Sequence, residues 1–194
     1  MTAARIGAIV LAGGRSSRFG SDKLAAMVDG RPLLERSVAA VRAVASVVVV
    51  VLAPGSHRDM PADVLIAHDA EAYEGPLAGV AAGLAAMPAD IEHVMIVGGD
   101  MPSLSVGVLA VLSEALGQAG EPAAAVLDEG GPMPMAVRAS AAGPAARDLL
   151  AAGERRLRAL PERLQAVVVP GAQWRILDPD ASTLRDIDRP ADLA

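Results

Sequence analysis

The sequence predicts an α/β fold in which helices cover a mostly parallel sheet. Two observations lead to this prediction. Short apolar runs, typical of buried strands, alternate with longer amphipathic segments, typical of helices. No internal repeat and no linker-like stretch divides the 194 residues, a length that suits one hydrophobic core. We therefore expect a single domain over residues 1–194.

Apolar runs without polar alternation predict strands that are covered on both faces. The runs that we assign to strands are 7–11, 47–51, 64–66, 93–97, 123–127 and 166–169. The turn signal Asp128-Glu-Gly-Gly131 follows the fifth run, so residues 133–138 are predicted to return as its antiparallel partner. The sheet is expected to be mostly parallel, with this small antiparallel excursion.

Segments with apolar residues at helical spacing predict helices between these strands. The segments are 32–44, 75–87, 106–116, 141–152 and 154–164. Pro32 and Pro76 suit the starts of the first two helices, and Pro88 suits the end of the second. The arginines of the last segment are expected to form a solvated face. Strands and helices in this order predict a Rossmann-like, three-layer domain.

The first predicted strand runs into a loop that is unusually rich in glycine, serine and cations, Leu11-Ala-Gly-Gly-Arg-Ser-Ser-Arg-Phe-Gly-Ser-Asp-Lys23. Its glycine spacing fits neither a Walker A loop nor a dinucleotide-binding fingerprint. Exposed backbone amides together with Arg18 and Lys23 suit the anionic oxygens of a triphosphate. The loop is therefore predicted to bind a nucleotide triphosphate.

Two carboxylates follow other predicted strands. Asp69 comes after the third strand and Asp100 after the fourth. Ligands of open α/β sheets bind beyond the carboxyl ends of the strands, where these side chains would meet the loop. Asp100 stands beside Gly98 and Gly99, which allow close approach, and is predicted to hold Mg²⁺ together with substrate phosphates. Asp69 is either a site residue or a turn residue.

Composition excludes several classes of function. The formal net charge of -6 disfavours a general nucleic-acid binder and an anionic-membrane binder. The absence of cysteine excludes disulfides, zinc thiolate sites and thiol chemistry. The apolar stretch after the first residues is too short for a signal peptide or a membrane span, so a cytoplasmic protein is expected. The three histidines have no metal-ligand spacing and are expected to be structural or exposed.

The glycine-rich loop closely resembles the signature of the molybdenum cofactor guanylyltransferases, a family of the nucleotidyltransferase superfamily. The resemblance extends over nearly the full chain in the expected order. Its further segments are Glu74-Gly-Pro-Leu-Ala-Gly79, Gly99-Asp-Met-Pro102, Pro132-Met-Pro-Met-Ala136, Gly153-Glu-Arg-Arg-Leu157 and Asp186-Ile-Asp-Arg-Pro-Ala-Asp-Leu193. The first segment resembles the family's second loop, the second its metal-binding Asp-Met-Pro, and the third its acceptor segment.

This resemblance implies a nucleotidyltransferase-type fold and the Mg²⁺-dependent transfer of GMP from GTP to the terminal phosphate of molybdopterin, with release of pyrophosphate. Lys23, helped by Arg18, would neutralise phosphate charge, and Asp100 would hold the Mg²⁺ and contact the nucleotide. The other implied nucleotide contacts are Leu11, Ala12, Gly13, Gly14, Asp69, Gly75, Pro76 and Leu77. Molybdoenzymes or cofactor-biosynthesis proteins would be the partner proteins. The sequence gives no indication of oligomeric state.

Several residues depart from the family pattern. No asparagine follows the second strand, no histidine stands beside Pro134, and Asp186 and Asp188 occupy positions where the family usually has asparagine. Three alternatives therefore stay open: transfer of CMP to the same cofactor, guanylylation of another phosphorylated small molecule, and a nucleotide-binding module without catalysis. Lys23 and Asp100 together favour an enzyme, because a module that only binds has no need of a metal carboxylate.

Overall fold

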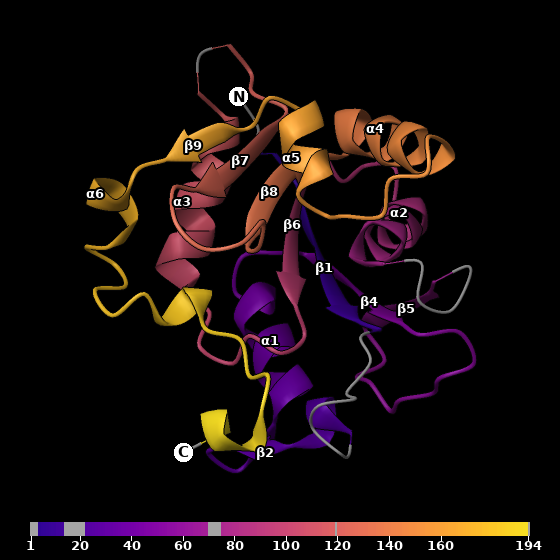
Figure 1. Cartoon of the computed structure of the whole chain (residues 1–194), viewed down its shortest axis with the longest axis vertical. Coiled ribbons are helices and arrows are strands. Elements are labelled where there is room, and N and C mark those ends of the chain that lie inside the picture. The colour runs from indigo at the N-terminus through magenta and orange to yellow at the C-terminus, as the bar shows by residue number, and fades with distance from the viewer. Residues whose placement is uncertain (1–3, 14–21, 70–74, 119, 194) are drawn as a thin grey trace.

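A twisted, mostly parallel sheet forms the centre of the protein, in a computed structural model that describes residues 4–13, 22–69, 75–118 and 120–193 (Figure 1). Within these residues the main sheet has seven strands in the order β5-β4-β1-β6-β8-β7-β9. The strands are β1 (Ile6–Ala12), β4 (Val47–Leu52), β5 (Val64–His68), β6 (His93–Gly98), β7 (Ala124–Leu127), β8 (Met135–Arg138) and β9 (Val167–Val169). Only β8 runs antiparallel to its neighbours β6 and β7, as the sequence predicts.

The register of the three central strands brings their carboxyl ends together. Strand β1 lies between β4 and β6, with Leu11 opposite Gly98 and Ala12 opposite Leu52. On the next strand, His68 of β5 lies opposite Leu52. The segments that follow β1, β4, β5 and β6 therefore all emerge at one edge of the sheet, which is the place where ligands bind in open α/β sheets.

Helices cover both faces of the sheet, as expected for a three-layer domain. They are α1 (Leu33–Arg42), α2 (Pro76–Ala86), α3 (Val106–Leu116), α4 (Ala139–Ala151), α5 (Ala159–Arg163) and α6 (Gly171–Trp174), with 3-10 helices η1 (Lys23–Ala25), η2 (Ser182–Leu184) and η3 (Pro190–Leu193). A separate hairpin joins β2 (Met27–Val28) to β3 (Arg31–Pro32). None of the helices in the described ranges is long and apolar enough to cross a membrane.

Alternation along β1 divides the core into two layers. Ala8 and Val10 pack on the side of α1 and α3, whereas Ile9 packs on the side of α2 and α4. Successive side chains of a strand point to opposite faces, and both faces of β1 are buried. This is the reason that the strand reads as a continuous apolar run.

Helix α2 lies unusually close to β1 because glycines face the strand. A Cβ atom on Gly83 would approach the Ile9 side chain to 2.8 Å, and one on Gly79 would approach Leu11 to 3.2 Å. The helix is thereby held against the carboxyl end of β1, with its amino terminus at the ligand edge of the sheet.

The helix predicted over 154–164 begins only at Ala159. Gly153 has a φ of 84°, which ends α4. The Glu154 carboxylate then accepts hydrogen bonds from the backbone N–H groups of Arg155 and Arg156 at 2.8 and 2.9 Å, forming a turn where the prediction has a helix. Hydrogen bonds from Arg156 and from these amides lower the pKa of Glu154 to about 2.

The chain returns to the ligand edge through residues 170–193, which we name the C-terminal segment. Figure 1 shows it passing from α6 down the side of the molecule to the neighbourhood of β2. The fully buried Trp174 indole donates a hydrogen bond to Asp128 Oδ1 at 2.9 Å. Further along, Asp178 accepts from the backbone N–H and hydroxyl of Ser182 and from Thr183 N–H, at 2.7 to 3.0 Å. These contacts fix the path of the segment.

Replacement of Leu109 by alanine should destabilise the fold, because this α3 side chain is fully buried in the core. We expect the free energy of unfolding to fall by about 2–5 kcal/mol. Leu65→Ala is the matched control, since Leu65 is 41% exposed on β5, and should give a much smaller decrease. Urea titration followed by the fluorescence of Trp174, the only tryptophan, measures both changes. Equal losses for the two variants would contradict this assignment of the core.

Candidate active site

A cavity of about 450 Å³ opens at the carboxyl ends of β1, β4 and β6. Eight of the residues predicted from the sequence to form the site line it: Leu11, Ala12, Gly13, Lys23, Asp69, Gly75, Pro76 and Asp100. The Leu77 side chain is not part of this lining, because it is fully buried in the core beneath α2. Gly14 and Arg18 lie outside the described residues.

The floor of the cavity is backbone. Leu11 and Ala12 end β1, and the Leu11 carbonyl accepts a hydrogen bond from Gly99 N–H at 2.9 Å. A Cβ atom on Gly13 would lie 3.3 Å from the backbone nitrogen of Ala53, so a side chain here would press on the neighbouring strand end. Glycine leaves this part of the floor open to a ligand.

The amino terminus of α2 forms one wall. Gly75 has a φ of 93°, and a Cβ atom there would lie 2.8 Å from the carbonyl oxygen of Arg155. Pro76 is the first residue of the helix, and Gly79 also lines the cavity. The unpaired N–H groups at a helix amino terminus favour anions, so this wall suits a phosphate or an electron-rich group of a ligand. Asp69, which follows β5, is held by its N–H donating to Leu52 O at 3.0 Å.

Lys23 provides the positive charge of the described cavity lining. Its ammonium donates to Asp100 Oδ2 and to Asp188 Oδ1, each at 2.9 Å, and its side chain is only 11% exposed. Burial lowers the pKa of Lys23, but hydrogen bonds and charge attraction from Asp188 and Asp100 outweigh burial and raise it. The ammonium is therefore fully charged at neutral pH.

Three carboxylates surround this ammonium. Asp100, Asp186 and Asp188 each offer an oxygen within 4.8 Å of the others, a set of hard oxygen donors that fits a divalent cation such as Mg²⁺. Burial, together with the negative charges of Asp188 and Asp100, raises the pKa of Asp186. Crowded carboxylates of this kind favour a bound cation.

The C-terminal segment is fixed against the end of β6 by its backbone. Ile187 N–H donates to the Asp100 carbonyl at 3.0 Å, which places Asp186 and Asp188 on either side of this contact. Asp192 then accepts from the N–H groups of Asp188 and Arg189 at 2.9 and 2.7 Å. The prediction from sequence assigned metal binding to Asp100 alone. The Asp-x-Asp spacing was the available signal, because residues two apart on an extended chain point to the same side.

Neighbouring residues fix the Asp100 loop. A Cβ atom on Gly98 would lie 2.4 Å from Asp100 Oδ1, so only glycine leaves room for this carboxylate position. From α1, the buried Ser37 hydroxyl donates to Met101 O at 3.0 Å, and Arg36 donates to Pro102 O at 3.3 Å. The carboxylate therefore sits on a rigid turn.

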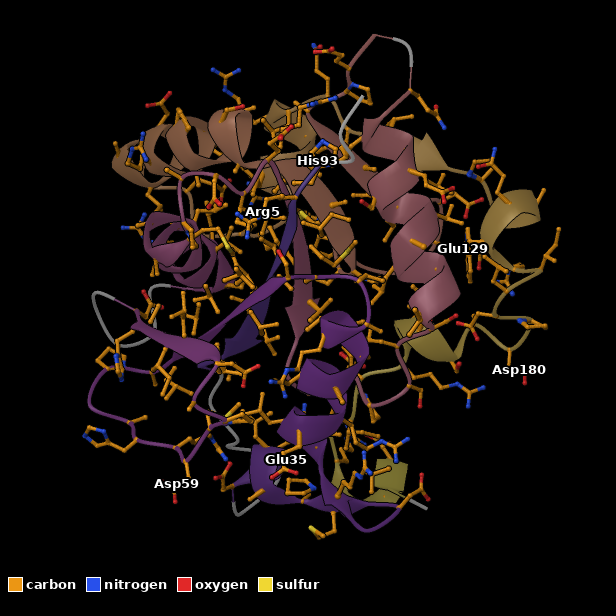
Figure 2. All side chains as sticks on the ribbon, turned by 180° about the vertical axis from the view of Figure 1, so that it is seen from behind. Arg5, Glu35, Asp59, His93, Glu129 and Asp180 are labelled. Carbon is orange, nitrogen blue, oxygen red and sulfur yellow. The ribbon has the colours of Figure 1, made fainter. Side chains whose placement is uncertain are left out.

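None of the three histidines lines the cavity. His93 is buried at the start of β6, and Figure 2 shows it beside Arg5, at the end of the sheet far from Glu35 and Asp59. Burial and the charge of Arg138 lower its pKa, so it is a neutral core residue. No hydroxyl, thiol or imidazole lines the cavity within the described residues. The site is equipped to bind an anion beside a cation, without a nucleophile of those types.

The cavity thus combines a cationic side chain, the amino terminus of a helix and carboxylates. Comparison with known proteins identifies the family of the chain. A family model described as the MobA-like NTP transferase domain matches residues 8–167. A probable molybdenum cofactor guanylyltransferase of Deinococcus radiodurans is 38% identical, with 96% of this chain and 91% of that protein covered. One of Chloroflexus aggregans is 35% identical, with 95% and 90% covered.

Solved structures agree on the fold. The molybdopterin-guanine dinucleotide biosynthesis protein A of Archaeoglobus fulgidus superposes with a TM-score of 0.76 at 24% identity, over 96% of this chain and 94% of that one. The 2-C-methyl-D-erythritol 4-phosphate cytidylyltransferase of Thermus thermophilus gives 0.71 at 20% identity, over 96% and 94%. Together with the family match over 8–167, these findings establish that the chain belongs to the MobA-like NTP transferase family.

Proposed function

We propose that this protein transfers GMP from GTP to the terminal phosphate of molybdopterin, forming molybdopterin guanine dinucleotide and releasing pyrophosphate. The observation that carries the proposal is the contact between Lys23 and Asp100 at the ligand edge of the sheet, inside a cavity walled by a helix amino terminus. The substrates are suggested by relatives that are 35 and 38% identical over most of the chain and are named molybdenum cofactor guanylyltransferases.

The reaction joins two phosphates. An oxygen of the acceptor phosphate attacks the α-phosphorus of GTP, a new P–O bond forms, and the bond to the β-phosphate oxygen breaks, so that pyrophosphate leaves. The acceptor oxygen is already a nucleophile, so the protein needs to supply positioning and charge. This requirement agrees with a cavity whose described lining has no hydroxyl, thiol or imidazole.

Each described site residue has a role in this scheme. The backbone around Gly13 and the amino terminus of α2 would hold the nucleotide through their amides. Lys23 would place its ammonium on phosphate oxygens, where charge accumulates in the transition state. Asp100, with Asp188 and Asp186 beside it, would hold Mg²⁺. The bound metal ion would neutralise phosphate oxygens and help to align the reacting groups.

Base and acceptor would occupy opposite walls. The segment Gly75-Pro76-Leu77 would lie near the guanine, with Leu77 contributing its backbone, since its side chain is buried. Met133 lines the cavity and belongs to the segment that resembles the family's acceptor region. Roles for Gly14 and Arg18 in phosphate binding, a cytoplasmic location and molybdoenzyme or cofactor-biosynthesis partners stay predictions from the sequence.

Binding of nucleotides in the presence of Mg²⁺ tests the base. We expect calorimetry to give GTP an affinity at least about tenfold higher than that of CTP or ATP, a difference of about 1.4 kcal/mol. Synthesis of molybdopterin guanine dinucleotide from GTP and molybdopterin is the accompanying activity measurement. A preference for CTP would overturn the guanylyl assignment while leaving the metal and phosphate residues in place.

Asp100→Asn tests the metal assignment. The change keeps the shape of the side chain and removes the charge that would hold Mg²⁺, so kcat should fall by about 10²-fold or more. Asp180→Asn is the matched control. Asp180 is an exposed carboxylate of the C-terminal segment (Figure 2) and belongs neither to the cavity lining nor to the carboxylate cluster. It should keep full activity. Thermal melting of both variants separates lost chemistry from lost folding, and full turnover by Asp100→Asn would refute the assignment.

A further inference from the structure

Lys23 differs in residue type from every other cationic side chain of this sequence. Of the 17 lysine and arginine residues, it alone is a lysine. Arginine presents a planar fork that holds a carboxylate in a fixed geometry, whereas lysine carries a compact charge on a flexible stem. The chain therefore has lysine instead of arginine at the one position where the proposed site would need a cation that can move.

The Lys23 ammonium already occupies the carboxylate cluster. It lies 2.9 Å from Asp100 and 2.9 Å from Asp188, two of the three residues whose oxygens fit a divalent cation. Asp188 is held in place for this contact by two hydrogen bonds described above: Ile187 N–H donates to Asp100 O, and Asp188 N–H donates to the Asp192 carboxylate. The cluster therefore holds a cation of the protein's own.

A divalent cation at the same oxygens would compete with the ammonium. Both would draw on the carboxylates of Asp100 and Asp188, and two cations a few ångströms apart repel each other strongly at a partly buried site. An incoming triphosphate changes the balance, since its oxygens offer Lys23 a partner of higher charge. Moving the ammonium to the phosphates would free both carboxylates.

We propose that Lys23 is a built-in counter-cation, held by Asp188 and Asp100 until a nucleotide triphosphate draws it away, so that divalent-cation binding is coupled to nucleotide binding. The coupling rests on the proposed nucleotidyl transfer. Asp188 is then a positioning residue, which keeps the Lys23 ammonium at the cluster in the absence of nucleotide. Because binding free energies are reciprocal, the cation would also strengthen nucleotide binding by the same factor.

Titration of nucleotide-free protein with Mn²⁺ alone tests the competition. Lys23→Met removes the ammonium and keeps most of the stem, and we expect Mn²⁺ to bind at least about tenfold more tightly than to the unaltered protein. Arg5→Met is the matched control, since it removes one positive charge at the opposite end of the sheet (Figure 2), where Arg5 pairs with Asp90. It should leave Mn²⁺ affinity unchanged. Equal or weaker binding by a folded Lys23→Met variant would overturn the proposal.

Side-chain NMR of Lys23 gives a second measurement, made on the unaltered protein and on one variant. Because Lys23 is the only lysine, protein carrying ¹⁵N- and ¹³C-labelled lysine gives side-chain NMR signals from this one residue. Saturating Mg²⁺ without nucleotide should move these signals as the ammonium leaves the carboxylates. Asp188→Asn should move them as well, toward the values of a solvated lysine. If Mg²⁺ leaves the signals unchanged, the role of Lys23 is overturned. If Asp188→Asn leaves them unchanged, the role of Asp188 is overturned.

GTP added without metal completes the test. We expect it to shift the Lys23 signals, and bound GTP without a shift would contradict release of the ammonium by nucleotide. Absence of GTP binding by calorimetry would instead count against the proposed function. The Mn²⁺ titration contains no nucleotide and no turnover, so it judges the competition independently of that result.

Discussion

The parallel register of β1 between β4 and β6 is the constraint on which the rest of the structure depends. It sets Leu11 beside Gly98 and Ala12 beside Leu52, and so brings three loop starts together at one edge of the sheet. Every described wall of the cavity follows from this placement, including the turn that carries Asp100. The glycines of α2 add to it by letting the helix approach β1 closely. The geometry of the sheet thus determines where the site residues lie.

Charged side chains dominate the site that the sheet brings together. The Lys23 ammonium and the carboxylates of Asp100 and Asp188 line the cavity, with Asp186 beside them, and the helix amino terminus faces the same space. Burial makes the Lys23 ammonium costly alone, and the neighbouring carboxylates offset that cost. A site of this kind is ready for a ligand that is itself both anionic and metal-bound. This is the physical basis for assigning nucleotidyl transfer to a cavity whose described lining carries no thiol, hydroxyl or imidazole.

Much of this could be predicted from the sequence, and the reasons are local. Strands buried on both faces read as apolar runs, and the order of strands and helices indicates the sheet. Lys23 and Asp100 could be selected because each lies in a segment that follows a strand, whereas Asp69 stayed open as a site or turn residue; all three line the cavity. The position of Asp186 and Asp188 beside Asp100 was not predicted, because it depends on where a long, irregular segment returns. The delayed start of α5 was missed for another reason: Glu154 bonds the backbone of its neighbours, and side-chain competition of this kind does not register in periodicity.

The contact between Lys23 and Asp188 joins residues 165 positions apart. A chain emerging from the ribosome can pair β1 with β4 and β6 long before the C-terminal segment exists. The carboxylate cluster therefore cannot form before residues 186–188 have joined the folded sheet. A chain that stops before Asp186 would carry Asp100 without its two companions.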